Sequence, residues 1–271
     1  QDRIKDADIV LTNKVLITKE HMDNSNIQLI CITATGMNNV DLEYAKIKKI
    51  EVKNVAGYST SSVVQVGFSM IFHFVQKLNY YKNYVDQGKW QKSDIFTHID
   101  KPFFELDGKK VGIIGLGEIG RNFAKKAKAF DCEVMYYSTS GRNSNSEYKQ
   151  VSLDELLKTC DIITIHAPLN DDTKDLLNYE NMKNIKDGAI LLNLGRGGII
   201  NEADLAKIID EKEIYCGIDV VSVEPILESN PLLKVKNKDR LLLTPHIGWA
   251  SIEARNKLVQ MVANNIRDFL N

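Results

Sequence analysis

The stretch that decides the fold is residues 111–130, which read VGIIGLGEIGRNFAKKAKAF. Its apolar beginning, residues 111–114, predicts a buried strand. Its second half predicts a helix with one apolar face, because apolar side chains recur there at helical spacing with lysines between them. Those side chains are Ile119, Phe123, Ala127 and Phe130. A strand, a glycine-rich turn and a helix therefore follow one another.

Three glycines occupy the turn, in the pattern Gly115-Leu116-Gly117-Glu118-Ile119-Gly120. Gly115 suits a tight turn, Gly117 lets a pyrophosphate approach the backbone, and Gly120 lets the helix pack closely on the strand. The N-terminus of the helix adds free N–H groups and the positive end of the helix dipole. Glycines alone would fit a turn in any α/β sheet, but the flanking strand and helix favour a dinucleotide site.

The composition narrows the classes of partner. The chain has 271 residues, enough for one large or two modest domains, and a net charge of −1 without a Lys/Arg block. Nucleic acid and membrane surfaces are therefore not indicated. No apolar run reaches the roughly 20 residues of a membrane span, and no signal-peptide pattern opens the sequence. The four cysteines lie far apart, as buried free thiols do in a reducing compartment. We expect a cytoplasmic protein that binds a small neutral or anionic molecule.

The first part of the chain predicts a small parallel sheet. Strand patterns lie at residues 9–12, 27–33 and 51–55, and helical patterns at 18–24 and 39–49. A parallel sheet this small normally has another strand, so we expect a further βα unit before Gln1.

The second part predicts a doubly wound parallel sheet, because strand and helix patterns alternate. The strand patterns lie at 111–114, 133–137, 161–165, 189–193, 215–220 and 241–244, and the helical ones at 152–160, 178–184 and 202–211. A last helix, residues 251–270, can pack back on the first domain. The predicted fold class is α/β, with a dinucleotide-binding domain, residues 62–255, inserted into a smaller substrate domain, residues 1–61 plus 256–271.

Residues 63–78 predict a helix that is apolar over nearly its whole circumference. Such a helix is buried on all sides, either within a large core or in a subunit interface. We favour the interface and therefore a homodimer. The following segment, residues 88–107, is aromatic and predicts an irregular linker.

Polar residues that could do chemistry follow the predicted strands. The planar fork of Arg196 suits a carboxylate, and its glycine neighbours favour a functional role over a structural ion pair. His246, with Asp219 and Glu224 after the preceding strand, could give a proton to a carbonyl oxygen while a hydride arrives at the carbon. His166 precedes Ala167-Pro168, which indicates a wall of the cofactor site rather than a catalyst.

Several motifs together resemble the NAD(P)-dependent D-isomer-specific 2-hydroxyacid dehydrogenases over nearly the whole chain. They are residues 115–120, His166-Ala167-Pro168-Leu169 with Thr173, Asn193-Leu194-Gly195-Arg196-Gly197, Asp219-Val220-Val221-Ser222-Val223-Glu224-Pro225, and Pro245-His246-Ile247-Gly248. Within the family, residues 38–41, 54–60, 230–233 and 249–251 are most similar to glycerate dehydrogenases, also called hydroxypyruvate reductases.

The resemblance implies an activity and a set of roles. A short 2-keto acid of the hydroxypyruvate or glyoxylate type would be reduced to its D-2-hydroxy acid with NAD(P)H, and no metal is implied. Arg196 would orient the substrate, His246 would be the acid/base, and Glu224 would pair with His246. The loop of Thr35, Gly36 and Met37 would bind the substrate carboxylate. The implied cofactor contacts are Gly115, Gly117, Glu118, Ile119, Gly120, Ser138, Thr139, Arg142, His166, Pro168, Thr173, Leu194, Asp219 (to the carboxamide), His246 and Gly248.

One position departs from the family. NAD-dependent members carry an acidic residue at the end of the second strand, where it holds the ribose hydroxyl. Ser138 stands at that position here, followed by Thr139, Ser140 and Arg142. Hydroxyl groups and a guanidinium suit a phosphate monoester, so we expect that NADP is tolerated or preferred, although the same residues would also serve in a surface loop.

Two other functions fit the resemblance. Oxidation of D-3-phosphoglycerate is disfavoured, because only Lys14 can be placed near the loop at Gly36 to meet a phosphorylated substrate. A nucleotide-sensing protein like the family's corepressors would keep the same motifs, but no partner-binding tail or low-complexity segment is present.

Overall fold

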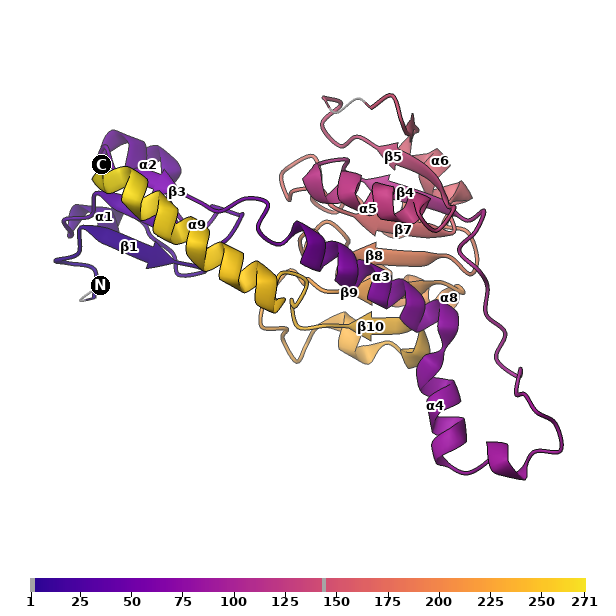
Figure 1. Cartoon of the computed structure of the whole chain (residues 1–271). Coiled ribbons are helices and arrows are strands. Elements are labelled where there is room, and N and C mark those ends of the chain that lie inside the picture. The colour runs from indigo at the N-terminus through magenta and orange to yellow at the C-terminus, as the bar shows by residue number, and fades with distance from the viewer. Residues whose placement is uncertain (1–2, 143–144) are drawn as a thin grey trace. The chain divides into compact units, whose positions relative to one another are not determined.

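A computed structural model of the chain describes residues 3–142 and 145–271. Contacts divide the chain into two units, residues 1–62 with 249–271 and residues 63–248 (Figure 1). The C-terminal part of the first unit begins at Trp249, not at position 256. The reason is that helix α9 (Ile252–Leu270) packs on this unit from its first turns, with Ala254 and Leu258 buried against the sheet residues Leu29 and Cys31.

The first unit contains a parallel sheet of the expected strands, in the order β1-β2-β3. The strands are β1 (Ile9–Thr12), β2 (Leu29–Ile32) and β3 (Glu51–Lys53), and the short helices are α1 (Lys19–Asp23) and α2 (Leu42–Ile47). The central strand β2 is buried on both faces, as its unbroken apolar sequence requires. Its residues 29 and 31 face α9, and residues 30 and 32 pack with α1 and α2.

The second unit is built on a parallel sheet of seven strands, in the order β10-β9-β8-β7-β4-β5-β6. The strands are β4 (Lys110–Ile114), β5 (Glu133–Tyr137), β6 (Lys149–Gln150), β7 (Ile162–Ile165), β8 (Ile190–Asn193), β9 (Tyr215–Ile218) and β10 (Leu241–Leu243). Six of them confirm the sequence prediction. The seventh, β6, was missed because its two residues are exposed at the edge of the sheet and show no apolar pattern.

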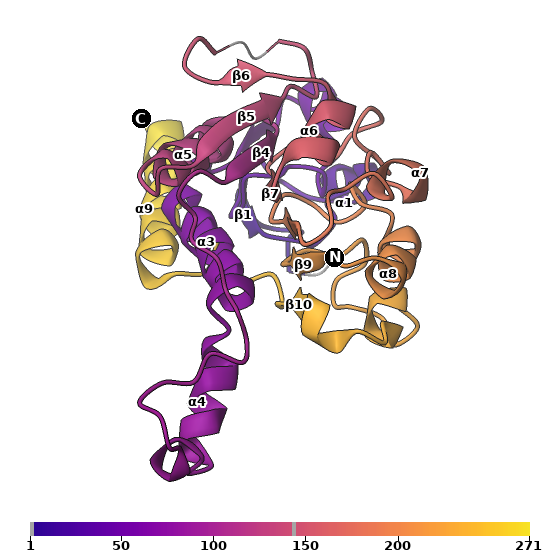
Figure 2. The ribbon, with the colours of Figure 1, turned by 90° about the vertical axis from the view of Figure 1, so that its right-hand side faces the viewer.

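Helices cover both faces of this sheet (Figure 2). On one face α3 (Thr60–Gln76) and α5 (Glu118–Lys128) pack on Ile113 and Ile162. On the other face α6 (Leu153–Thr159), α7 (Tyr179–Met182) and α8 (Glu202–Glu211) pack on Ile114 and Ile163. Neighbouring strand residues therefore point into opposite cores, and the doubly wound arrangement brings all strand ends to the same edge.

The helix that the sequence placed in a subunit interface is α3, and the structure corrects that prediction. Its apolar side chains lie in the core of its own unit: Val64, Met70 and Ile71 are at most 2 % exposed. Gln65, Ser69 and His73 form a polar stripe that is exposed. The helix is thus amphipathic, and its wide apolar surface is used against the sheet.

A second helix, α4 (Leu78–Asp86), was not predicted; it lies between the predicted helix at residues 63–78 and the segment expected to be irregular, residues 88–107. It has no buried residue, so it lacks the one-sided apolar pattern that marks a packed helix. With the 3₁₀ turn η1 (Trp90–Lys92) and residues 93–103 it extends away from the sheet (Figures 1 and 2). We call residues 78–103 the arm. Its own contacts hold it: the ring of His98 stacks on Tyr84 at 3.7 Å and lies 2.8 Å from the Tyr80 hydroxyl.

No helix in residues 3–142 or 145–271 is long and apolar enough to cross a membrane.

Candidate active site

The glycine turn between β4 and α5 has the geometry that a bound pyrophosphate needs. Gly115 has a φ of +92°, and a Cβ there would lie 2.8 Å from the Ala167 nitrogen. A Cβ on Gly120 would lie 2.3 Å from the Gly115 carbonyl oxygen, so helix and strand meet without a side chain between them. Around Gly117 a Cβ would meet nothing within 4 Å. The start of α5, at Glu118, therefore borders open space where the N–H groups of the first helical turn can bind an anion.

Ser138 follows β5 and is 7 % exposed. Its hydroxyl has no hydrogen-bond partner among the described residues. Buried hydroxyl groups are nearly always paired, so an unpaired one at the expected ribose position fits a site that a ligand completes. Thr139 is half-buried and Arg142 is exposed, in a turn where the Arg142 N–H donates to the Ser140 hydroxyl over 3.3 Å.

The loop after β7 forms one wall of the predicted cofactor site, and its side chains are held by hydrogen bonds. Burial lowers the pKa of His166 to about 3, so its imidazole is neutral and cannot serve as an acid near neutral pH. Its Nε2 lies 3.0 Å from the Thr164 hydroxyl, and its buried Nδ1 has no partner among the described residues. Thr173 is fully buried, and its hydroxyl donates to the Pro168 carbonyl over 2.6 Å. These contacts agree with a wall rather than a catalytic role.

Arg196 follows β8 in a turn that Asn193 fixes. The Asn193 side chain, 2 % exposed, accepts from the Gly195 N–H at 3.1 Å and donates to the Arg196 carbonyl at 2.9 Å. A Cβ on Gly197 would lie 2.0 Å from the Val221 carbonyl carbon, so this turn lies directly against the chain after β9. Leu194, which lies between Asn193 and Gly195, is buried in the core shared with α3 and α5.

Glu224 and His246 come together at the ends of the neighbouring strands β9 and β10. The distance from Glu224 Oε2 to His246 Nδ1 is 2.7 Å, and both side chains are a little over a quarter exposed. The other Glu224 oxygen accepts from the Val221 N–H at 3.3 Å. Because Nδ1 faces the carboxylate, Nε2 is left for another partner.

The backbone of His246 is held in an uncommon conformation, with a φ of +53°. The carboxylate of Asp219, 3 % exposed, supports this turn. It accepts from the Ile247 N–H at 2.8 Å, from the Gly248 N–H at 2.8 Å and from the Thr244 hydroxyl at 2.6 Å. The structure thus gives Asp219 a supporting task that the sequence did not indicate, and its contact with a carboxamide stays a prediction.

The expected substrate loop lies in the first unit. Its conformation is set by the Thr35 hydroxyl, which donates to the Val55 carbonyl at 3.1 Å, and by the Asn54 amide, which donates to the Thr35 carbonyl at 2.6 Å. Within the described residues, the backbone N–H groups of Gly36 and Met37 donate no hydrogen bond, and both residues are half-buried. Two such groups can bind a carboxylate.

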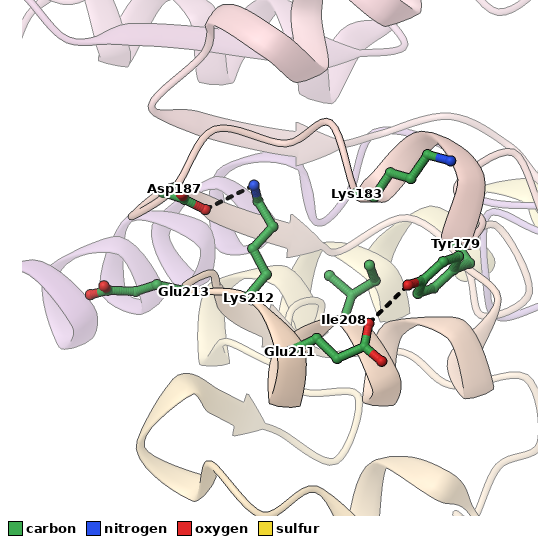
Figure 3. A pocket seen from close by; sticks show the side chains of 7 residues that line it. All are labelled: Tyr179, Lys183, Asp187, Ile208, Glu211, Lys212 and Glu213. Atoms are coloured by element: carbon green, nitrogen blue, oxygen red, sulfur yellow. Dashed lines mark hydrogen bonds and ion pairs between the residues drawn. The ribbon is translucent and has the colours of Figure 1, made fainter.

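A separate concavity of about 410 Å³ lies between α7 and α8 (Figure 3). Three of its charged groups have partners: Lys212 contacts Asp187 at 2.8 Å, and the Tyr179 hydroxyl donates to Glu211 at 2.9 Å. Asp187 precedes β8 and Glu213 precedes β9, so the concavity lies at the amino ends of the strands. Arg196, Glu224 and His246 lie at the opposite edge of the sheet. The described residues contain no cluster of three or more potential metal ligands.

Comparison with known proteins agrees with this geometry. Residues 68–248 match the NAD binding domain of the D-isomer specific 2-hydroxyacid dehydrogenases. The chain is 40 % identical to a hydroxypyruvate reductase of Blautia hydrogenotrophica, over 99 % of this chain and 84 % of that protein. It therefore belongs to the D-isomer specific 2-hydroxyacid dehydrogenase family, which confirms the resemblance seen in its motifs, and it is an oxidoreductase.

Two solved structures show the same fold. One is an acyclic imino acid reductase in complex with NADPH and D-Arg, at 29 % identity, with a TM-score of 0.83 over 99 % of this chain and 84 % of that one. The other is the D-lactate dehydrogenase of Aquifex aeolicus with NAD and lactic acid, at 25 % identity, with a TM-score of 0.86 over the same shares. One of these structural relatives thus binds NADPH and the other binds NAD.

Proposed function

We propose that this protein reduces a short 2-keto acid of the hydroxypyruvate or glyoxylate type to its D-2-hydroxy acid with a reduced nicotinamide cofactor. The observation that carries the proposal is the 2.7 Å contact between Glu224 and His246 on the sheet edge that also carries the open glycine turn. The name of the 40 % identical relative supports the substrate class.

The residues of this chain would divide the work as follows. A bound nicotinamide supplies the hydride, and Gly117 and the first turn of α5 would hold its pyrophosphate. The Glu224 carboxylate fixes the His246 ring through Nδ1, so that Nε2 can face the carbonyl oxygen and donate a proton to it. Arg196 would bind the substrate carboxylate with its planar fork. We propose carboxylate binding for the free N–H groups of Gly36 and Met37 as well.

The test is turnover with hydroxypyruvate, glyoxylate, pyruvate and phosphohydroxypyruvate. His246→Ala should lower kcat by ~100-fold or more, since general acid catalysis contributes about 10²–10⁴-fold, while the Kd for the cofactor stays unchanged. His73→Ala, an exposed histidine on α3, is the matched control. Wild-type rates in His246→Ala would refute the assignment, and a preference for phosphohydroxypyruvate would favour the phosphoglycerate reaction instead.

For the cofactor we propose that NADPH is accepted and preferred over NADH. A carboxylate at position 138 would bind the ribose hydroxyl and repel a 2′-phosphate, and Ser138 does neither. Its unpaired hydroxyl can donate to a phosphate oxygen, and the exposed Arg142 can add a charge-assisted contact. The imino acid reductase structure with NADPH shows that this fold accommodates NADPH.

For assembly we propose a homodimer formed through the arm. The arm exposes seven large apolar side chains, among them Phe96 at 89 % and Ile99 at 73 %. Monomeric proteins rarely expose so much apolar surface in one segment, and a second copy of the same arm is the partner of matching character. We also propose a cytoplasmic location, because all four cysteines are buried free thiols.

A further inference from the structure

The loop that carries Glu224 needs an anchor. Residues 222–229 lie in the segment between β9 and the 3₁₀ turn η2 (Pro231–Lys234). Every one of these residues is exposed as a whole, although the Glu224 side chain itself is only a little over a quarter exposed. Exposed loops with few contacts are mobile, yet Glu224 has to stay within hydrogen-bond distance of His246 for the proposed reaction.

Glu202, the first residue of α8, attaches both ends of this loop. Its Oε1 accepts from the Ser222 N–H at 2.5 Å, and its Oε2 accepts from the Asn230 side-chain amide at 2.7 Å. Asn230 is 8 % exposed, and its own oxygen accepts from the Leu232 N–H at 3.0 Å. Helix α8 is in turn fixed at this end, because the Asn201 side chain caps it by accepting from the Asp204 N–H.

We propose that Glu202 is a positioning residue, whose carboxylate clamps the base of the 222–229 loop and thereby holds Glu224 against His246. The inference rests on the proposed function above. A carboxylate can accept from these two donors with its two separate oxygens, which a side-chain amide cannot do, and charge-assisted bonds of this kind are the stronger ones. An acidic residue in a first helical turn also stabilises the helix, but that role alone would leave the proton-transfer step unchanged.

The chain offers a rescue design. In Glu202→Gln the amide nitrogen must face one of the two donors, Ser222 or Asn230, so one end of the loop is released. In the double variant Glu202→Gln with Asn230→Asp, the new amide donates to the new carboxylate and its oxygen still accepts from Ser222. That variant also keeps the total charge. Glu228→Gln removes an exposed charge from the same loop and is the control.

We expect Glu202→Gln to lower kcat for the keto acid by about tenfold, since small displacements of catalytic groups have effects of this size, and to alter the pH profile of kcat/KM. The Kd for NADPH should stay unchanged, Glu228→Gln should match the wild type, and the double variant should recover most of the loss. Crystal structures should show a longer Glu224–His246 distance in Glu202→Gln alone.

Three outcomes would overturn the role of Glu202. The first is a Glu202→Gln variant within twofold of wild-type kcat with an unchanged Glu224–His246 distance. The second is an equal loss of kcat and cofactor affinity, which would indicate general loosening. The third is a double variant with the clamp restored in its crystal structure but no recovery of kcat. A wild type without keto-acid turnover would instead refute the proposed function, and the crystal structures alone would then decide on Glu202.

Discussion

Two glycines of one turn should respond to the same substitution in opposite ways. A Cβ on Gly120 would lie 2.3 Å from the Gly115 carbonyl oxygen, a backbone atom that cannot turn away. A Cβ on Gly117 would meet nothing within 4 Å, and its φ of −75° is open to alanine. Gly120→Ala should therefore damage the fold, whereas Gly117→Ala should damage cofactor binding.

The size of each effect can be estimated from opposing contributions to the free energy of unfolding and to cofactor binding. In Gly120→Ala, overpacking costs about 1–3 kcal/mol or more, and the higher helix propensity of alanine returns at most ~1 kcal/mol. We expect a net loss of about 1–3 kcal/mol in the free energy of unfolding. In Gly117→Ala the loss at the N-cap is at most about 1 kcal/mol, but the methyl group fills the space where the pyrophosphate has to approach, and we expect a Kd for the cofactor that is tenfold weaker or worse.

The assays are chemical denaturation for stability and fluorescence titration of NADPH and NADH for the Kd. Gly117→Ala should unfold nearly as the wild type does and bind poorly. A Gly117→Ala variant with wild-type affinity would refute the placement of the pyrophosphate. Wild-type stability in Gly120→Ala would refute the close packing of α5 on β4.

Four further predictions concern single side chains. Burial lowers the pKa of His166 from 6.5 to about 3, so the unfolded chain binds a proton that the folded chain does not, and stability should fall as the pH drops below 6.5. Between pH 6.5 and 5 this amounts to about 2 kcal/mol, and denaturation of His166→Gln over that range should lack this part of the loss. Thr244→Val removes a 2.6 Å bond to a buried carboxylate and should cost about 1–3 kcal/mol in denaturation, with a lower kcat; unchanged values would contradict the support of the His246 turn. Ser138→Asp should move the ratio of kcat/KM for NADPH over NADH toward NADH by tenfold or more, about 1.4 kcal/mol, and an unchanged ratio would remove Ser138 from the cofactor site. Phe96→Glu should convert the dimer to monomer in sedimentation while Val259→Glu, at a position 65 % exposed on α9, does not; a dimer in both variants would exclude the arm as the interface.

The sequence alone predicted those parts of the fold and of the site for which local pattern and chemistry agree. The glycine turn at Gly115, Gly117 and Gly120 could be placed because each glycine has a distinct steric reason, and the strand and helix beside it have different periods. The pairing of Glu224 with His246 was implied by the family resemblance, and it agrees with the topology, since both residues follow strands of one parallel sheet whose carboxyl ends share an edge.

The features that the sequence did not predict depend on partners far away in the chain. Glu202 looks like an ordinary acid in a first helical turn, and its partners lie 20 and 28 residues further on. Asp219 could be singled out, but its support of the His246 turn depends on how β9 and β10 align. Helix α4 gave no periodic signal because none of its residues is buried, and α3 was misjudged because its polar stripe is only three residues wide.

Stereospecific reduction of a 2-keto acid by this chain can be measured directly. Purified protein should be incubated with hydroxypyruvate and NADPH, and in a parallel reaction with NADH, and the product resolved by chiral chromatography. We expect one D-glycerate for each NADPH consumed, with a rate of formation that is lower by ~100-fold or more in His246→Ala. Consumption of neither nicotinamide cofactor, or formation of the L isomer, would contradict the proposed reduction.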